Sequence, residues 1–168
     1  MKPISMKPIR SSLQAFAIGM LALAATAPAL ADKEDFPTAK GTTPTIPGID
    51  SDALEKFGGE EGVHKWAEAL FYYIMLDNRI NWIFERFGNP KRQIELNTQL
   101  ETMVLGGPAK YQGASMSAAH SDLHITLTQF NAVVEAAYNA CERVNTPYHV
   151  CNQLIAALAP FERVIVTR

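Results

Sequence analysis

The chain has 168 residues, a length typical of one domain, and its 15 basic and 17 acidic residues give a formal net charge of −2. A mildly acidic sequence without a basic cluster does not favour binding to nucleic acid, and no basic amphipathic helix indicates binding to a membrane surface. The sequence also lacks G-x-S-x-G, a glycine-rich phosphate loop, and a flavin or nicotinamide fingerprint. It therefore offers little support for nucleophilic or nucleotide-dependent catalysis.

Residues 1–31 have the pattern of a secretory signal peptide. Lys2, Lys7 and Arg10 form a basic start, an apolar stretch of small residues follows, and an A-x-A cleavage signature ends at Ala31. The apolar stretch is too short for a membrane-spanning helix, although an uncleaved membrane anchor is the alternative. We expect cleavage after Ala31, export to the periplasm or out of the cell, and no membrane insertion afterwards. Loss of three basic residues and no acidic one would change the net charge from −2 to −5.

The segment 32–50 is rich in proline, glycine and threonine and has no periodic apolar pattern. This composition is typical of a flexible tether. We therefore expect one folded domain at residues 51–168.

Helices are predicted along most of that domain. Ser51 and Asp52 are suited to cap a short helix that runs to Phe57, and two glycines at 58–59 end it. A longer helix follows, with acidic residues in its first turn and apolar residues at helical spacing up to Asp77. Residues 79–87 form a compact aromatic segment.

The next helix is predicted from Pro90 to Leu105, because Asn89 before Pro90 has the order of a cap followed by a first helical residue. Two glycines at 106–107 end this helix. After a glycine-punctuated passage comes a short helical turn that carries His120.

Thr126 and Gln129 have the spacing of a capping box, which predicts a helix to about Val144. The last helix is expected to begin at Thr146-Pro147, with its apolar side reaching Phe161. No segment alternates like a strand, so the fold class is all-α.

Cys141 and Cys151 are the two cysteines, and they do not form the C-x-x-C-H motif of thioether haem attachment. They fall at the end of one predicted helix and the start of the next. In an oxidising compartment they could form a disulfide, and the alternative is two small buried hydrophobic residues.

His120 is the first candidate for a ligand-binding residue. A neutral imidazole on a short helix, with alanines beside it, is suited to hold a metal or a haem iron. The alternative is a histidine with a purely structural role. His124 lies four residues later, as in zincins, but the second position of the motif is Ser121 instead of the glutamate that such chemistry needs.

Gln93, Asn97 and Leu100 lie with Val104 on one face of the helix that begins at Pro90. Two amides on an otherwise apolar face are costly to bury without partners. A bound polar ligand is one such partner, and each other, the backbone or water are the others.

The run GGPAKYQG, followed by M-x-x-A-H at 116–120 and the exit through Leu123 to Ile125, resembles the truncated haemoglobins, group I in particular. The resemblance covers roughly residues 51–166. It implies a two-over-two helical sandwich around haem b, with His120 as the axial ligand of the iron.

The resemblance also implies roles for other residues. Gln93 and Asn97 match the two distal positions, whose amides could donate a hydrogen bond to dioxygen. The remaining pocket positions that the resemblance implies are Phe71, Phe84, Leu100, Tyr111, Met116, Ile125, Phe130 and Val133. Tyr111 could meet a haem propionate together with Lys110, and exposure of both is the alternative.

Two positions depart from the family pattern. Phe71 stands where the family commonly has a distal tyrosine, and Tyr72 should point elsewhere because a helix turns about 100° per residue. Glu101 stands where an apolar residue is usual.

The implied activity is reversible binding of dioxygen, nitric oxide or carbon monoxide, and nitric oxide dioxygenation is a reaction that it could support. Any redox turnover would take electrons from another protein, because the chain carries no motif for a second redox cofactor. A haem-based gas or redox sensor of the cell envelope is the second hypothesis, and a haem-free helical module is the third.

Overall fold

The computed structural model describes residues 46–108 and 111–168. The predicted signal peptide, most of the predicted tether and Lys110 lie outside these residues, so those predictions stay untested. Where the predicted tether enters the described part, Ile46 and Ile49 pack against the hydrophobic core.

Within the described ranges the regular structure is helical and contains no named strand, as predicted. The elements are α1 (Ala53–Lys56), α2 (Gly59–Leu76), α3 (Asn81–Phe87), α4 (Pro90–Val104), α5 (Met116–His120), α6 (Leu127–Arg143), α7 (Tyr148–Leu158), the 3-10 helix η1 (Ala159–Phe161) and α8 (Glu162–Ile165).

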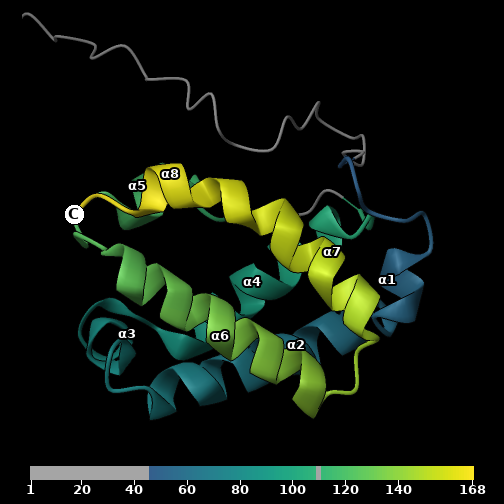
Figure 1. The fold of residues 1–168 in the computed structure, drawn as a ribbon, viewed down its shortest axis with the longest axis horizontal. Coiled ribbons are helices and arrows are strands. Elements are labelled where there is room, and N and C mark those ends of the chain that lie inside the picture. The colour runs from purple at the N-terminus through teal and green to yellow at the C-terminus, as the bar shows by residue number, and fades with distance from the viewer. Residues whose placement is uncertain (1–45, 109–110) are drawn as a thin grey trace, which may run out of the picture. The chain divides into compact units, whose positions relative to one another are not determined.

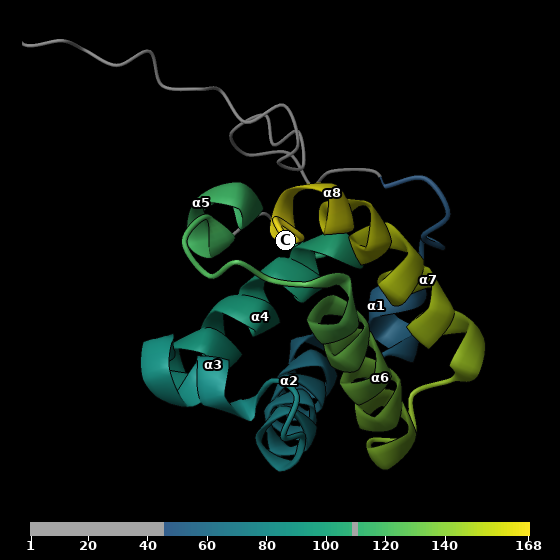
Figure 2. The same ribbon diagram turned by 60° about the vertical axis from the view of Figure 1, so that its left-hand side comes forward.

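Four long helices form two layers. Helix α2 packs against both α4 and α6, and α7 packs against both α6 and α4, so each layer holds two helices (Figure 1). The short helices complete the domain, with α3 beside α2 and α5 beside α8 (Figure 2). This is the expected two-over-two sandwich, in which the long helices α2 and α4 precede α5 in the sequence and α6 and α7 follow it.

The helix boundaries follow from local sequence signals. Thr126 and Gln129 form the predicted capping box at α6, and the Asn89 side chain accepts a hydrogen bond from the Arg92 backbone at 3.1 Å to cap α4. Gly58, with a φ of 96°, is in the left-handed region that ends α1. The side-chain cap expected at α1 is absent, because the Asp52 carboxylate instead pairs with Lys56 at 2.9 Å.

Two elements differ from the prediction. The aromatic segment folds into α3, although its seven residues gave no periodic signal. The last predicted helix is interrupted, because Pro160 lacks an amide proton and the chain forms η1 before it resumes as α8. Beyond α8, an isolated parallel bridge joins Val166 to Ile125, and the Thr167 amide donates to the Ile125 carbonyl at 3.0 Å.

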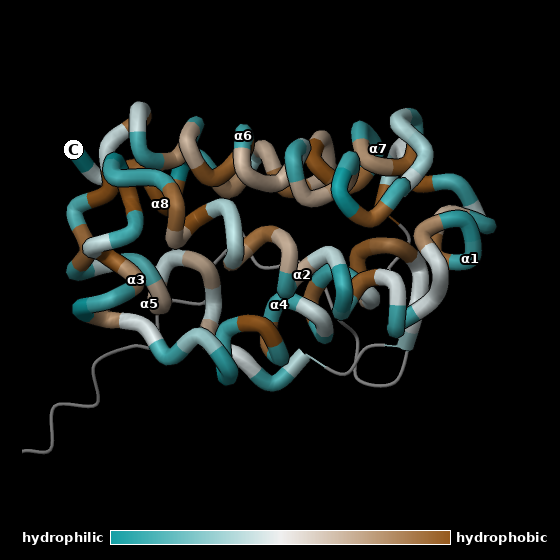
Figure 3. The backbone as a smooth tube through the Cα atoms, turned by 90° about the horizontal axis from the view of Figure 1, so that it is seen from below, coloured by the Kyte–Doolittle hydropathy of each residue, from teal (hydrophilic) through white to brown (hydrophobic). Residues whose placement is uncertain are grey.

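Apolar residues recur along α6 and α7 at helical spacing, with hydrophilic residues between them (Figure 3). Those that face inward join α2 and α4 in one core. Among the described residues, no helix combines the length and the apolar character needed to cross a membrane.

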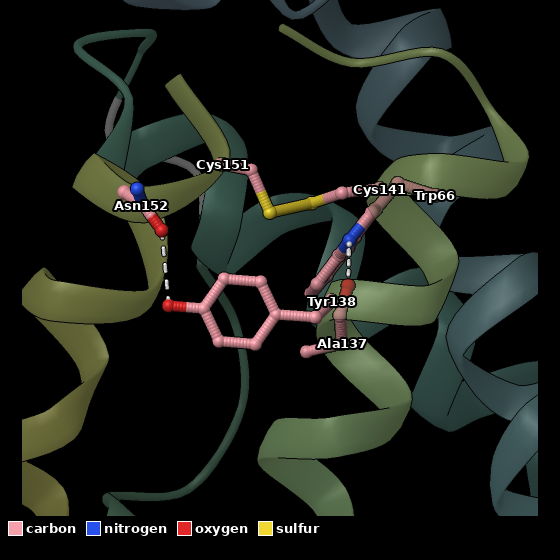
Figure 4. The surroundings of a disulfide bond; sticks show 6 residues. All are labelled: Trp66, Ala137, Tyr138, Cys141, Cys151 and Asn152. Atoms are coloured by element: carbon pink, nitrogen blue, oxygen red, sulfur yellow. Dashed lines mark hydrogen bonds between the residues drawn. A yellow bond between two sulfur atoms is a disulfide. The ribbon is translucent and has the colours of Figure 1, made fainter. Parts of the chain in front are cut away.

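A disulfide between Cys141 of α6 and Cys151 of α7 lies in this core, which settles the alternative left open by the sequence (Figure 4). Beside it, the Trp66 indole donates to the Ala137 carbonyl at 3.2 Å, which ties α2 to α6. The Tyr138 hydroxyl is bonded to Asn152 at 3.0 Å, a second link between α6 and α7. These links fix one end of the two layers.

Candidate functional site

A cavity of about 360 Å³ lies inside the domain. This volume is in the range of pockets that hold small molecules and cofactors. Side chains from α2, α3, α4, α5, α6, α7 and α8 contribute to its walls, together with η1 and the loop that precedes α5. The walls are mostly apolar, and the polar groups among them are few.

All the predicted pocket residues line this one cavity. They are Phe71, Phe84, Gln93, Asn97, Leu100, Tyr111, Met116, His120, Ile125, Phe130 and Val133. They come from helices far apart in the sequence, which the fold brings together. Their contact with haem stays a prediction.

His120 reaches the cavity from the end of α5, a helix that Ser115 caps by accepting from the Ala118 backbone at 3.1 Å. The imidazole Nδ1 lies 2.7 Å from the Met116 carbonyl. A carbonyl only accepts, so Nδ1 carries the proton and Nε2 keeps its lone pair. Burial lowers the pKa of His120 below its ordinary value, which favours the neutral form that binds metals.

Phe71 and Tyr72 show which face of α2 meets the cavity. Phe71 is buried, lines the cavity and packs edge-to-face on Phe84, with ring centroids 5.6 Å apart. Tyr72 is 47% exposed, and its ring stacks under the guanidinium of Arg143 at 4.3 Å. Phe71 therefore faces inward and Tyr72 outward, as predicted. The cavity has a phenyl ring at position 71, which cannot donate a hydrogen bond as a tyrosine hydroxyl would.

The two amides of α4 that were predicted to be distal, Gln93 and Asn97, differ in their partners. The Asn97 amide nitrogen donates to the Gln93 backbone carbonyl at 2.8 Å, one of the alternatives that the sequence left open. The Gln93 Oε1 is buried with no hydrogen-bond partner among the described residues. A buried amide oxygen without a partner is costly, so Gln93 has unused hydrogen-bonding capacity in the cavity wall.

Glu101 lies two turns after Gln93 on α4 and also lines the cavity. Its side chain is nearly inaccessible to solvent, and its Oε2 has no partner in the described part of the chain. Burial alone raises the pKa of this carboxyl from 4.5 to about 8, so it is mostly protonated at neutral pH.

Tyr111 is half-buried at the cavity wall, and its hydroxyl donates to the Ala114 carbonyl at 2.7 Å. The loop before α5 is folded around this ring, because a side chain on Gly113 would clash with it. The hydroxyl predicted to meet a propionate is thus already bonded to its own loop.

Several wall residues were not predicted as pocket residues. They include Phe161 and Ile165 from the C-terminal elements, Phe87 from α3, Trp66 from α2 and Ile155 from α7. The interruption at Pro160 redirects the chain after α7, and the Ile125–Val166 bridge brings it back to the cavity. Neither feature has a periodic sequence signal.

The zinc alternative receives no support from the geometry. His124 is exposed and does not line the cavity that His120 faces. In residues 46–108 and 111–168, no three His, Cys, Asp or Glu side chains lie close enough to form a metal site.

The family described as bacterial-like globin matches residues 52–167 of the chain. A group 1 truncated hemoglobin of Tetrahymena thermophila is 30% identical over 82 residues, which are 49% of this chain and 67% of the relative. That of Tetrahymena pyriformis is 35% identical over 82 residues, which are 48% of this chain and 66% of the relative. The matched region thus spans about two thirds of each relative.

Solved structures share the fold at lower identity. The truncated hemoglobin of T. pyriformis in its Fe(III) form superposes with a TM-score of 0.65 at 22% identity, over 69% of this chain and 98% of the other. The 2/2 hemoglobin of Synechococcus sp. PCC 7002, in the cyanomet state with covalently attached heme, gives a TM-score of 0.64 at 23% identity over the same shares.

Proposed function

Because the chain belongs to the bacterial-like globins, and within them to the group 1 truncated haemoglobins, we propose that it holds haem b in the cavity and reversibly binds a diatomic gas there. The observation that carries this proposal is the geometry of His120. Its Nδ1 is engaged by the Met116 carbonyl, which orients the ring and leaves Nε2 as a ligand at the cavity wall.

The walls of the cavity fit a porphyrin. Phe84, Ile125, Phe130 and Val133 offer apolar contacts for a flat aromatic macrocycle, and Met116 adds a flexible side chain that fills irregular gaps. The haem iron would supply the coordination site at which a gas molecule binds. The protein would supply an apolar enclosure that excludes bulk water and a distal side formed by Phe71, Gln93 and Asn97.

Dioxygen, nitric oxide and carbon monoxide are the candidate ligands. Of the distal groups, Gln93 has free capacity to hydrogen-bond a polar ligand, and its amide can rotate to present either a donor or an acceptor. We further propose nitric oxide dioxygenation as the reaction, with electrons from a separate donor protein.

We also propose that the chain is exported after cleavage at Ala31. The Cys141–Cys151 disulfide supports this proposal, since disulfides persist in oxidising compartments and are rare in the cytosol. Recovery of the protein from the cell envelope tests export, and the visible spectrum of that protein tests haem binding.

The test of haem ligation is the replacement of His120. We expect purified protein to bind haem with defined ferric, ferrous and carbonyl spectra, and His120→Ala to lose most of its haem. His124→Ala is the matched control, because this histidine is exposed and absent from the cavity wall. Equal haem content and equal ferrous spectra in the His120 variant and the control would refute the assignment.

A further inference from the structure

The cavity wall contains a carboxyl group that the proposed gas chemistry does not use. Glu101 is 2% exposed, lines the cavity, and has an oxygen without a hydrogen-bond partner among the described residues. A structural glutamate would be expected to bond a neighbour, because a buried polar group that stays unpaired costs free energy. Glu101 is therefore a buried acid in the cavity wall whose Oε2 has no stabilising partner in the described part of the chain.

The surroundings of Glu101 keep it neutral. None of the described residues that line the cavity is a lysine or an arginine. Besides Glu101, the titratable side chains among the described cavity-lining residues are His120 and Tyr111. The other charged and titratable residues of α2, α3, α4, α6, α7 and α8, such as His64 of α2 and Tyr148 and His149 of α7, do not line the cavity. His64 is bonded to Thr98 of α4 at 3.1 Å, and Tyr148 and His149 are exposed. No positive partner thus offsets ionisation of the carboxyl.

We propose that the charge of Glu101 decides whether the cavity binds small monovalent anions, such as azide or nitrite, and that the side chain acts on them from a distance. This inference rests on the proposed haem site, where such an anion would bind. Neutral gases would bind whether the carboxyl is protonated or ionised, whereas an anion would bind well only while the carboxyl is neutral. Glu101 would thus determine which class of ligand the protein accepts at a given pH.

The size of the effect follows from the helix geometry. Glu101 lies eight residues after Gln93, which places their backbones about 12 Å apart along the axis of α4. Two like charges about 12 Å apart at an effective dielectric constant of about 20 change an equilibrium roughly tenfold. Ionised Glu101 would therefore repel an anion near the distal amides without touching it.

The experiment compares ferric holoprotein, Glu101→Gln and Glu95→Gln between pH 6.5 and 9.5. Glutamine keeps the shape of glutamate but cannot ionise. Glu95 is the matched control, because it is an exposed acid on the same helix. Azide affinity is measured by spectral titration, and hydroxide binding, measured separately without azide, is corrected for. Carbon monoxide binding to the ferrous proteins is the neutral comparison.

We expect the azide affinity of the wild-type protein to fall about tenfold relative to Glu101→Gln as the pH rises, with a midpoint near 8. Glu95→Gln should follow the wild type, and carbon monoxide should bind all three proteins alike. Parallel azide profiles for the wild type and Glu101→Gln would overturn the proposal.

Infrared spectroscopy of the wild-type protein tests Glu101 without any ligand. A protonated-carboxyl band should be present at pH 6.5, disappear by pH 9.5, and be missing in Glu101→Gln. Absence of this band at pH 6.5 would overturn the proposal even if the variant does not fold. Because the band does not require haem, an absent haem spectrum would refute the proposed function separately.

Discussion

Phe71→Tyr introduces a phenol at a cavity position that we predict to be distal. Phe71 is 4% exposed and packs edge-to-face on Phe84, so the added hydroxyl would lie inside the cavity and away from bulk water. A hydrogen bond contributes about 1 kcal/mol net and about 2 kcal/mol when its partner carries charge. Dioxygen in the haem pocket carries partial negative charge, so we expect the variant to release it roughly five- to thirtyfold more slowly.

Stopped-flow dissociation of dioxygen from the wild type and the variant measures this effect. Carbon monoxide is less polar when bound and should show a much smaller change. Tyr72→Phe removes a neighbouring phenol that is exposed, so it is the matched control and should leave the oxygen rate unchanged. An unaltered oxygen rate in Phe71→Tyr would mean that position 71 does not approach the ligand, and the distal assignment would be wrong.

Three further predictions concern stability and processing. Burial raises the pKa of Glu101 from 4.5 to about 8. The neutral carboxyl therefore makes its full contribution to stability below pH 4.5. Between pH 4.5 and about 8 the free energy of unfolding falls by about 1.4 kcal/mol per pH unit. Urea unfolding at equal haem content measures the free energy of unfolding of the wild type and Glu101→Gln. The difference between the two should change by about 4 kcal/mol from pH 5 to pH 8, and a constant difference would contradict the buried neutral acid. The Cys141–Cys151 disulfide closes a loop with a sequence separation of 10. Replacing both cysteines with serine should therefore lower the free energy of unfolding by about 2.5 kcal/mol. A loss below about 1 kcal/mol would argue against this loop-closure effect. N-terminal sequencing of protein from the native envelope should begin at Asp32, and a product that begins at Met1 would refute cleavage.

Local signals in the sequence were sufficient for most helix boundaries. The capping box at Thr126 and the Asn89-Pro90 start of α4 depend on residues within one turn, and both were predicted correctly. Asp52 was predicted incorrectly because a lysine one turn later competes for its carboxylate. The break at Pro160 was missed, since the apolar spacing continues across it up to Phe161.

The candidate site depends more on tertiary packing. The register of α2 followed from helical geometry, so Phe71 could be assigned to the inner face before the structure was known. Glu101 was recognisable as an unusual residue, but its lack of a partner depends on side chains from several helices. The closure of the cavity by Phe161 and Ile165 depends on the Ile125–Val166 bridge, which joins segments about 40 residues apart and has no local sequence signal.

The helix that carries His120 is weakly anchored in the cavity wall. Helix α5 has five residues, none of them buried, and its principal neighbour is the short α8. Free energies of local opening are low where few apolar contacts are buried, whereas α2 and α6 contribute to the core and open only near global unfolding. The amides of α5 would therefore exchange with deuterium before those of α2 and α6. Cofactor could enter and leave by an excursion of this one turn, while the two-layer frame stays folded.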